Sequence, residues 1–498
     1  MHLNAVAERI RLQQQGQGRP IISTTFNGHR MVAVGDEVHW SPKWKVFPDF
    51  LGDYLKTKLG REWAEAEFAK PLEQRHPIFQ WYDRFCAFQA SQVPGPDGIR
   101  RATGTGVVWC YMGLAYSLYL IKHNVDLQDR LITRLKDPQN FQGAYYELIV
   151  ANCLIRAGFE LELEDEQDNS TGHCEFAARH KATNTLYSVE AKMRGVAGIL
   201  GKGQHDGASN TDPTHKVTYH LGEALRKPAA GQRLVFIDIN AEGISDGEPA
   251  WVARAYDRLA KSEKGRSDGK SAYVFITNMN HHRHLDDERA NGAVLGFGYG
   301  IPDFAKVEQL SLPEVYRRKQ KHAIAYSIME SFRGYTKLPV TFDGRLGSDA
   351  SGATSRRIII GERYIFDDPI GIAEVTSVSA IPAERTKYIA VHAVNGESSI
   401  LTADMDDEEI HDYNLHGDVI YGELHNNNKR TDTPFELFEW LVRTYSKYPV
   451  EGLLKQIEGS PDIEQFRSLP REQLIIAVAE RVALTIVSSN NKNKPNES

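Results

Sequence analysis

The chain has few cysteines, no excess of basic residues and no long apolar run. Its four cysteines are widely spaced and form no C-x-x-C pair, which argues against a disulfide scaffold and against a structural zinc site. Lysine and arginine number 59 against 66 acidic residues, and the net charge of −7 excludes a chain that is basic throughout. A local basic cleft is still compatible with this balance. The reducing cytoplasm is the simplest setting for such a chain, so we expect a cytoplasmic protein.

No segment is predicted to direct export or to cross a membrane. Glu8 and Arg9 interrupt the apolar core that a secretory signal would need. The uncharged stretch from Thr103 to Ile121 contains three tyrosines, and its apolar part is shorter than the roughly 20 residues of a membrane span. We therefore expect a buried helix there and no membrane partner.

The rest of the composition predicts a chain that folds into several domains. Hydrophobic residues make up 41% of the sequence and charged residues 25%, values typical of globular proteins. At roughly 100 to 200 residues per domain, the 498 residues indicate two to four domains. The local patterns predict a mainly helical N-terminal region (1–135), a central α/β domain (136–335), a small antiparallel β module (338–425), a C-terminal helical region (430–487) and a disordered tail (488–498).

The central domain is predicted to alternate helices and strands in the order α-β-β-β-α-β-α-β. Apolar residues recur at helical spacing in the first segment, and the segments that follow alternate apolar and polar residues as strands do. Five residues that include Asn184 join the second and third strands, which indicates a hairpin. The predicted elements are a helix at 144–158, strands at 159–166, 174–180 and 186–192, a helix at 215–227, a strand at 233–239, a helix at 249–261 and a strand at 271–278.

Four charged residues of this domain are the candidates for catalysis. Glu190 and Lys192 are two positions apart on a strand and therefore project from the same face. The predicted hairpin could bring Glu175 beside Glu190. Glu147 lies within an otherwise apolar helix, where an isolated buried carboxylate is costly unless it is paired or bound to a metal.

These residue types suit hydrolysis of a phosphodiester bond. Mg²⁺ is usually bound by one or two carboxylates together with water and phosphate oxygens, and Mn²⁺ could replace it. A lysine beside such an ion can orient or deprotonate a water molecule or stabilise the charge that develops on the phosphate. The constellation therefore predicts a site for Mg²⁺, with Mn²⁺ as a substitute.

The order of helix-Glu, strand-acid and strand with E-x-K resembles the PD-(D/E)xK nuclease superfamily, over about residues 138 to 300. The resemblance implies a restriction-endonuclease-like α-β-β-β-α-β core, flanked here by an N-terminal helical region, a C-terminal β module and a helical tail. It implies that Glu175 and Glu190 bind the metal with help from the backbone carbonyl of Ala191. It also implies that Lys192 assists the attacking water and that Glu147 supports a second metal or the outer ligand shell.

One departure from the family pattern motivates an alternative. The family usually has an Asp preceded by Pro at the first strand position, whereas Glu175 stands here and follows Cys174. The alternative is a nuclease-like fold that has lost catalysis and serves as a nucleic-acid-binding or assembly subunit. A third hypothesis rests on analogy of fold alone: the chain is an effector of a bacterial restriction or anti-phage defence system. In that case it could work as a homo-oligomer or with a partner protein.

Local charge favours a polyanionic partner, with DNA preferred over RNA. Between residues 179 and 233 nine basic residues face four acidic ones, a balance of +5 in a chain of net charge −7. Arg194, Lys202 and Lys216 are the candidate nucleic-acid-binding residues. The Gly-rich loop after the E-x-K strand could close over a phosphate, and a plain mobile linker is an equal alternative.

Other motifs are interpreted structurally. We expect His281, His282 and His284 to lie in a polar loop after a strand, and Gly296 to Gly300 to form a turn. The basic run from Arg317 to Lys321 could grip phosphates, although a solvated helix face is the commoner explanation. The acidic run from 404 to 412 is interpreted as the solvated start of a helix.

Overall fold

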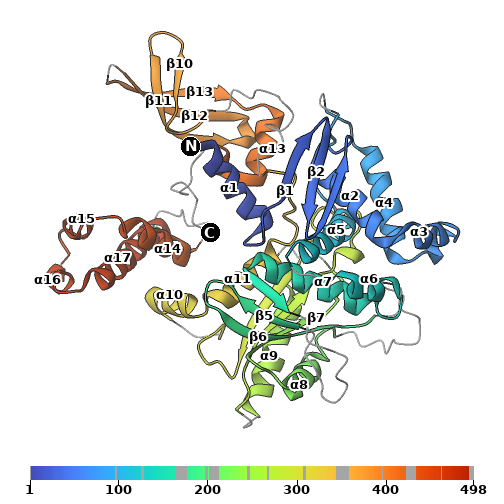
Figure 1. Cartoon of the computed structure of the whole chain (residues 1–498). Coiled ribbons are helices and arrows are strands. Elements are labelled where there is room, and N and C mark those ends of the chain that lie inside the picture. The colour runs from blue at the N-terminus through green and yellow to red at the C-terminus, as the bar shows by residue number, and fades with distance from the viewer. Residues whose placement is uncertain are drawn as a thin grey trace, which may run out of the picture. The chain divides into compact units, whose positions relative to one another are not determined.

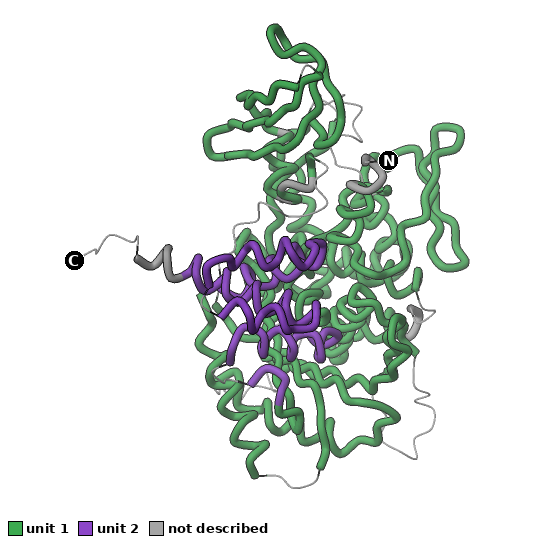
Figure 2. Tube along the Cα trace, turned by 90° about the vertical axis from the view of Figure 1, so that its left-hand side faces the viewer, with its two compact units in different colours: residues 1–302, 327–426 green, residues 303–326, 427–498 purple. Residues whose placement is uncertain are grey.

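The computed structural model gives a mixed α/β protein (Figure 1). The chain divides into two compact units, unit 1 with residues 1–302 and 327–426 and unit 2 with residues 303–326 and 427–498 (Figure 2). The structure describes residues 2–95, 98–124, 128–162, 176–196, 200, 212–243, 247–265, 269–306, 310–343, 358–394, 396–421, 433–460 and 462–492.

The N-terminal part of unit 1 is mainly helical, and it also contains a three-stranded antiparallel sheet that the sequence analysis missed. The sheet begins with a hairpin whose turn, Asn27-Gly28, has φ values of 47° and 76°, as a two-residue hairpin turn requires. The elements are α1 (His2–Gln15), β1 (Ile22–Phe26), β2 (His29–Val34), β3 (Glu37–Ser41), α2 (Phe47–Leu59), α3 (Arg61–Phe68), η1 (Leu72–Gln74), α4 (Pro77–Ser91), α5 (Gly106–Asn124) and α6 (Gln128–Lys136).

One face of this small sheet is apolar and exposed. Ile22, Phe26, Val38 and Trp40 all project from it, and the two aromatic side chains are each 65% exposed. The opposite face packs inward through Val32 and Val34.

Helix α5 is the buried helix that the sequence predicts, and most of its residues are inaccessible to solvent. Its tyrosines pack against aromatic rings of neighbouring helices, as Tyr111 does on Phe85 and Tyr119 on Phe50. Within the described parts of the chain, no helix has the length and apolar character to cross a membrane.

The central α/β region has the predicted order of elements. A six-stranded sheet runs in sequence order from β4 to β9: the first three strands form an antiparallel meander, β6, β7 and β8 are parallel, and β9 is antiparallel to β8. The elements are α7 (Phe141–Arg156), β4 (Phe159–Glu162), β5 (Phe176–His180), β6 (Thr185–Met193), α8 (Val217–Arg226), β7 (Gln232–Asp238), α9 (Ala250–Lys264), β8 (Ala272–Asn278), η3 (His281–Arg283) and β9 (Ala293–Tyr299).

The glycine-rich segment 296–300, predicted as a turn, is mostly strand. Gly296 pairs with Phe275 and Gly298 with Tyr273, because β9 forms a regular antiparallel ladder with β8. Of this segment only Gly300 has a positive φ, 65°, and it ends the strand. The sequence signal for this strand is the pair of apolar residues Phe297 and Tyr299, which are both buried, whereas the glycines led to the prediction of a turn.

Helices cover both faces of the large sheet. Parallel neighbours need crossover connections, and α8 and α9 supply them and pack on one face against Val235, Ile237 and Val274. Helix α7 lies on the other face, where the Tyr146 hydroxyl is 2.7 Å from Thr277 Oγ1. On that same face Phe332 of α11 (Ala323–Arg333) stacks on the ring of Phe236 of β7.

The predicted β module is present in unit 1 as an antiparallel meander. Its strands are β10 (Arg363–Phe366), β11 (Gly371–Ile381), β12 (Thr386–Ala393) and β13 (Ser398–Asp404), with η4 (Pro382–Glu384), α13 (Asp407–His416) and η5 (Gly417–Tyr421). The acidic run does begin a helix, and Asp406 caps it by accepting from the amide of Glu409. It is not wholly solvated, since the buried Glu409 carboxylate binds Lys387 at 2.6 Å.

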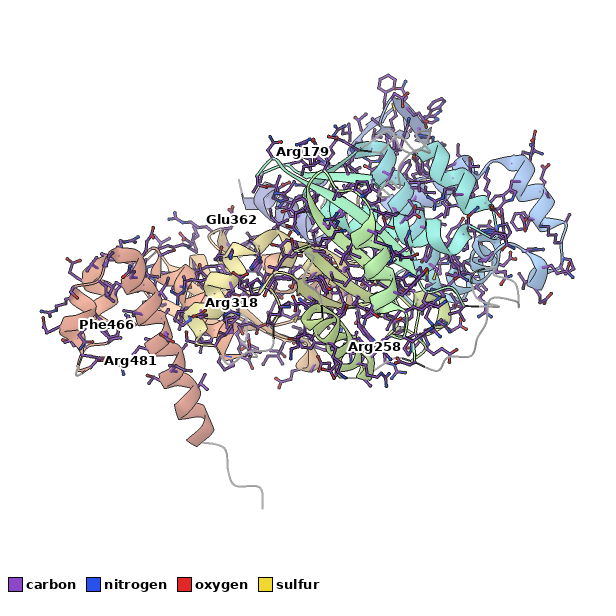
Figure 3. All side chains as sticks on the ribbon, turned by 90° about the horizontal axis from the view of Figure 1, so that it is seen from below. Arg179, Arg258, Arg318, Glu362, Phe466 and Arg481 are labelled. Carbon is purple, nitrogen blue, oxygen red and sulfur yellow. The ribbon has the colours of Figure 1, made fainter. Side chains whose placement is uncertain are left out.

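Unit 2 is helical, and basic side chains of the run from Arg317 to Lys321 form ion pairs within it. Lys319 binds Glu439 at 2.7 Å, Arg318 binds Glu314 at 3.4 Å, and Lys321 binds Asp303 (Figure 3 labels Arg318). These pairs support the structural interpretation of the basic run over a phosphate grip. The helices are α10 (Leu312–Lys321), α14 (Pro434–Tyr445), α15 (Val450–Lys455), α16 (Ile463–Arg467) and α17 (Arg471–Lys492), so α17 extends five residues into the segment predicted as a disordered tail.

Substitution of two helix glycines, one in α5 and one in α2, would test the packing of α5. A Cβ on Gly106 would collide with the carbonyl oxygens of His281 and His284, whereas a Cβ on Gly52 of α2 would meet nothing within 4 Å. We expect Gly106→Ala to lower the free energy of unfolding by about 1–3 kcal/mol. The matched control Gly52→Ala should raise it by about 0.5–1 kcal/mol, since alanine is the better helix former. Urea unfolding of both variants checks this, and equal effects would contradict the close approach at Gly106.

Candidate functional site

Glu190 and Lys192 lie together on β6, as the sequence predicts. Lys192 Nζ is 2.7 Å from Glu190 Oε1, and the Glu190 side chain is only 3% exposed. Both side chains project from the sheet face that α8 and α9 cover, because Glu190 is paired with Val235 in the parallel register and Val235 belongs to that core. The hairpin is also present, with Phe176 opposite Val189.

A second lysine, Lys227, contacts the same carboxylate, and the sequence analysis missed its role. Its Nζ lies 2.7 Å from Glu190 Oε1 and 2.8 Å from Oε2. Lys227 follows the last residue of α8, and Arg233 Nη2 donates to its carbonyl oxygen at 3.0 Å. It was counted in the basic segment, but its partner is 37 positions away and no local pattern reveals such a contact.

Glu147 is buried on α7 and held by Arg134. The guanidinium of Arg134 donates to both carboxylate oxygens of Glu147, at 2.5 and 2.6 Å. The expected need of this carboxylate for a partner is therefore met by an arginine. Because α7 packs on the face opposite to that of the Glu190 side chain, the structure does not bring these two carboxylates together. A metal-supporting role for Glu147 stays a prediction.

The remaining predicted site residues have varied surroundings. Ala191 is buried beside Phe236 in the ladder, and Lys216 is exposed at the start of α8. Arg194 is tied to the strand ends, since its amide donates to the carbonyl of Asp238 at 2.8 Å. Glu175, Lys202 and most of the Gly-rich loop lie outside the described residues.

The donor set can be compared with what a divalent cation needs. Among the residues that the structure describes, no three His, Cys, Asp or Glu side chains are grouped so that they could hold a metal. Mg²⁺ is often bound by only one or two carboxylates, the other ligands being water and substrate phosphate. Glu190, together with Glu175 as predicted, has the right chemistry for such a site, but both Glu190 oxygens are already held by ammonium groups.

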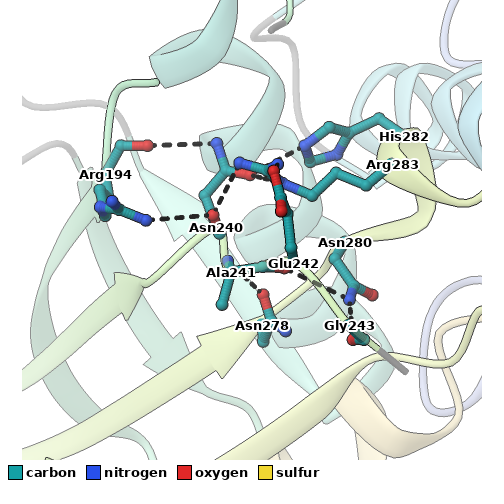
Figure 4. A network of polar contacts seen from close by, with 9 residues as sticks. All are labelled: Arg194, Asn240, Ala241, Glu242, Gly243, Asn278, Asn280, His282 and Arg283. Atoms are coloured by element: carbon teal, nitrogen blue, oxygen red, sulfur yellow. Dashed lines mark hydrogen bonds and ion pairs between the residues drawn. The ribbon is translucent and has the colours of Figure 1, made fainter. Parts of the chain in front are cut away.

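A second buried polar network lies at the carboxyl ends of β6, β7 and β8 (Figure 4). Its centre is Asn240, which is fully buried and has a φ of 42°, a left-handed conformation that is rare for a residue with a side chain. Asn240 Nδ2 donates to the carbonyl of Arg194 at 3.2 Å, and its Oδ1 accepts from Arg283 Nε at 2.8 Å. The network therefore links the segments that follow β6, β7 and β8, which are far apart in the sequence.

The histidines predicted to lie in a polar loop are instead largely buried. His281 and His282 lie in η3 and are almost inaccessible, because that turn packs against the first turn of α5. Burial lowers the pKa of His281 to about 4 and that of His282 to about 3, so both rings are neutral. Since Asn240 Oδ1 is an acceptor, His282 Nε2 donates to it at 3.0 Å.

Asp238, at the end of β7, is a fully buried carboxyl that the sequence analysis did not single out. Its oxygens accept from the amides of Met279 and Asn240 and from the hydroxyl of Thr277, each at 2.8 Å. Burial raises the pKa of Asp238 to about 6, and these hydrogen bonds oppose that rise. Position 238 follows an apolar strand run, which was the only sequence signal for it.

Comparison with protein-family models, with curated proteins and with solved structures finds no match to this chain. Arguments about its function therefore rest on its own residues and contacts.

The raised pKa of Asp238 predicts a defined pH dependence of stability. The folded-state pKa, about 6, is above the ordinary value of 3.8, so the folded protein binds this proton more tightly than the unfolded chain does. The stabilisation is complete below about pH 4 and is lost as the pH rises to about 6. The free energy of unfolding of the wild type minus that of Asp238→Asn should fall by roughly 2–3 kcal/mol over this window. Urea unfolding at several pH values measures it, and a flat or rising difference would contradict the assignment.

Proposed function

We propose that the chain is a metal-dependent nuclease that hydrolyses phosphodiester bonds, with DNA preferred over RNA. The observation that carries the proposal is the contact between Glu190 and Lys192 on one face of a central strand. A restriction-endonuclease-like core is part of the proposal. The order α7-β4-β5-β6-α8-β7 and the mixture of antiparallel and parallel strands support it.

The register of the hairpin supports including Glu175. Phe176 is opposite Val189 and Ala177 is opposite Ser188, so each step forward along β5 is matched by one step backward along β6. A ladder that continued by one pair would place position 175 opposite Glu190. Glu175 itself lies outside the described residues. In this proposal the two carboxylates share one divalent cation.

The proposed roles follow from charge and position. A bound Mg²⁺ or Mn²⁺ would polarise the phosphate and lower the pKa of a coordinated water. Glu190 and Glu175 would hold it, with the Ala191 carbonyl as a further oxygen donor. Lys192, whose side chain is 29% exposed, would orient the attacking water or stabilise the charge that develops on the phosphate oxygens.

Basic residues near the strand would bind the nucleic-acid backbone. Lys216 is exposed at the start of α8, and Arg194 follows β6 by one residue. Lys202 is a third candidate in the basic segment. Such contacts position a duplex without reading its sequence, so the proposal specifies a phosphodiester substrate and no target sequence.

The test is cleavage of plasmid, linear duplex, single-stranded DNA and RNA with Mg²⁺, Mn²⁺ or EDTA. We expect Glu190→Gln and Lys192→Met to slow cleavage roughly 100-fold or more, as removal of groups that act on the reacting centre does. EDTA should abolish cleavage. Lys261→Met, which removes an exposed charge from α9, is the matched control and should leave the rate unchanged. Cleavage that persists in both site variants, each shown to be folded by its cooperative unfolding, would rule out this site.

A second function is favoured by the ion pairs themselves. Each carboxylate of the constellation that the structure describes is held by a cationic side chain, Glu190 by two lysines and Glu147 by Arg134. A nuclease-like fold that binds nucleic acid without cleaving it would have such neutralised acids. Metal-independent binding that weakens with salt, with no hydrolysis under any metal, would distinguish this function in the same assay.

A further inference from the structure

The small N-terminal sheet has an apolar face that is open to solvent, here called the β1–β3 face. The strand register places eight side chains on it, in three rows that run across the strands: Phe26 and His29; Thr24, Met31 and Trp40; Ile22, Ala33 and Val38. Phe26 and Trp40 are each 65% exposed, Ile22 is 56% exposed and Val38 is 51% exposed. A contiguous apolar patch of this kind marks an interaction surface, because its removal from water is favourable.

The side chains of the β1–β3 face select an uncharged partner. None of the eight is an acid, a lysine or an arginine. Charged side chains of the same strands point to the opposite face, where Arg30 lies over the ring of Phe342 and Glu37 binds Lys58 at 2.6 Å. A nucleic acid would need cations for its phosphates, and a charged peptide would need counter-charges. A second apolar surface fits, and a second copy of the chain supplies one.

We propose that two copies of the chain associate through their β1–β3 faces, related by a two-fold axis between the two sheets. Two-fold pairs are the commonest oligomers and need a surface that is complementary to itself. With the axis perpendicular to the strands, the middle row of one copy lies on the middle row of the other. The Phe26 row then lies on the Ile22 row of the second copy, so that rings meet smaller aliphatic side chains. The surface is separate from the proposed catalytic site, because Glu190 belongs to a different sheet.

The exposed area of the β1–β3 face is sufficient for a reversible dimer. An aromatic side chain has roughly 150–250 Å² to bury, so the exposed parts of Phe26 and Trp40 amount to about 200–300 Å². Ile22 and Val38 raise this to about 400–500 Å² per copy, the size of the largest patches on monomeric proteins. Two copies together reach the roughly 1,000 Å² that a specific interface needs. Since this is the lower limit, we expect a dissociation constant of about micromolar order.

Sedimentation velocity of the full chain from about 0.1 to 100 µM tests the proposal, because that range spans a micromolar dissociation constant. We expect the wild type to change from monomer to dimer across it. Phe26→Ser and Trp40→Ser should each weaken the dimer about 30-fold or more, as the loss of a central aromatic anchor does. Ile22→Ser should also weaken it. The matched control Ile365→Ser removes an isoleucine that is 84% exposed on β10, in another sheet, and should leave the dimer unchanged.

Two charge variants identify the partner as a second copy. Thr24 is exposed in the middle row and, in the proposed arrangement, faces Thr24 of the partner subunit. Thr24→Lys and Thr24→Glu should each stay monomeric, because like charges would meet across the axis, whereas an equal mixture of the two should associate. Since Thr24 lies on the surface, these variants decide the question even if Trp40→Ser fails to fold.

Several results would overturn the proposal. One is a wild type that stays monomeric over the whole range, and another is a dimer that Phe26→Ser and Trp40→Ser leave equally strong. A dimer that only Ile365→Ser disrupts would belong to the β module instead. If the wild type stays monomeric and binds a single-stranded oligonucleotide, and Trp40→Ser loses this binding, the occupant of the face is a nucleic acid stacked on its rings. Each of these outcomes leaves the proposed nuclease activity to its own test.

Discussion

The burial of helix α7 is the constraint on which the central part of unit 1 depends. Every residue of Phe141–Arg156 except one glycine is buried, so polar side chains on the helix are stabilised by partners inside the protein. Gln142 bonds the backbone after β6, Glu147 binds α6, and Asn152 bonds α5. Tyr146 bonds Thr277 in the sheet. The polar groups of α7 thus fix its position between the helices and the sheet, which apolar packing alone specifies less sharply.

Two buried carboxyl groups of the sheet are accommodated in different ways. Asp238 accepts its hydrogen bonds from neutral donors, two amides and a hydroxyl, and burial keeps its pKa raised. Glu190 is held by the ammonium groups of Lys192 and Lys227, which compensate its charge. A fixed set of neutral donors suits a structural role at the strand ends. Partly exposed charged partners suit a site that acts on a charged substrate, and this contrast is why Glu190 and not Asp238 is the better candidate for catalysis.

The order of elements in the central region could be predicted because hydrophobic periodicity is local, and the shared face of Glu190 and Lys192 follows from the two-residue period of a strand. The β1–β2 hairpin was missed although Asn27-Gly28 is a strong turn signal, since it lies in the region that was interpreted as mainly helical. Contacts between distant positions could not be predicted at all: Lys227 meets Glu190 across 37 positions. The burial of His281 likewise depends on α5, which lies far back in the chain. The roles of the site residues in catalysis remain predictions.

The division of unit 2 into two segments of the chain has a consequence for its synthesis. Helix α10 packs through Tyr316 on Phe438 of α14, and Lys319 pairs with Glu439, 120 positions later. At roughly 5–20 residues per second, a ribosome needs about 6–24 s to make the intervening chain. During that interval the β module can fold, while α10 has none of its partners from the C-terminal segment. Completion of unit 2 is therefore a late event, and chains that end before α14 lack the ring and the carboxylate that Tyr316 and Lys319 of α10 contact.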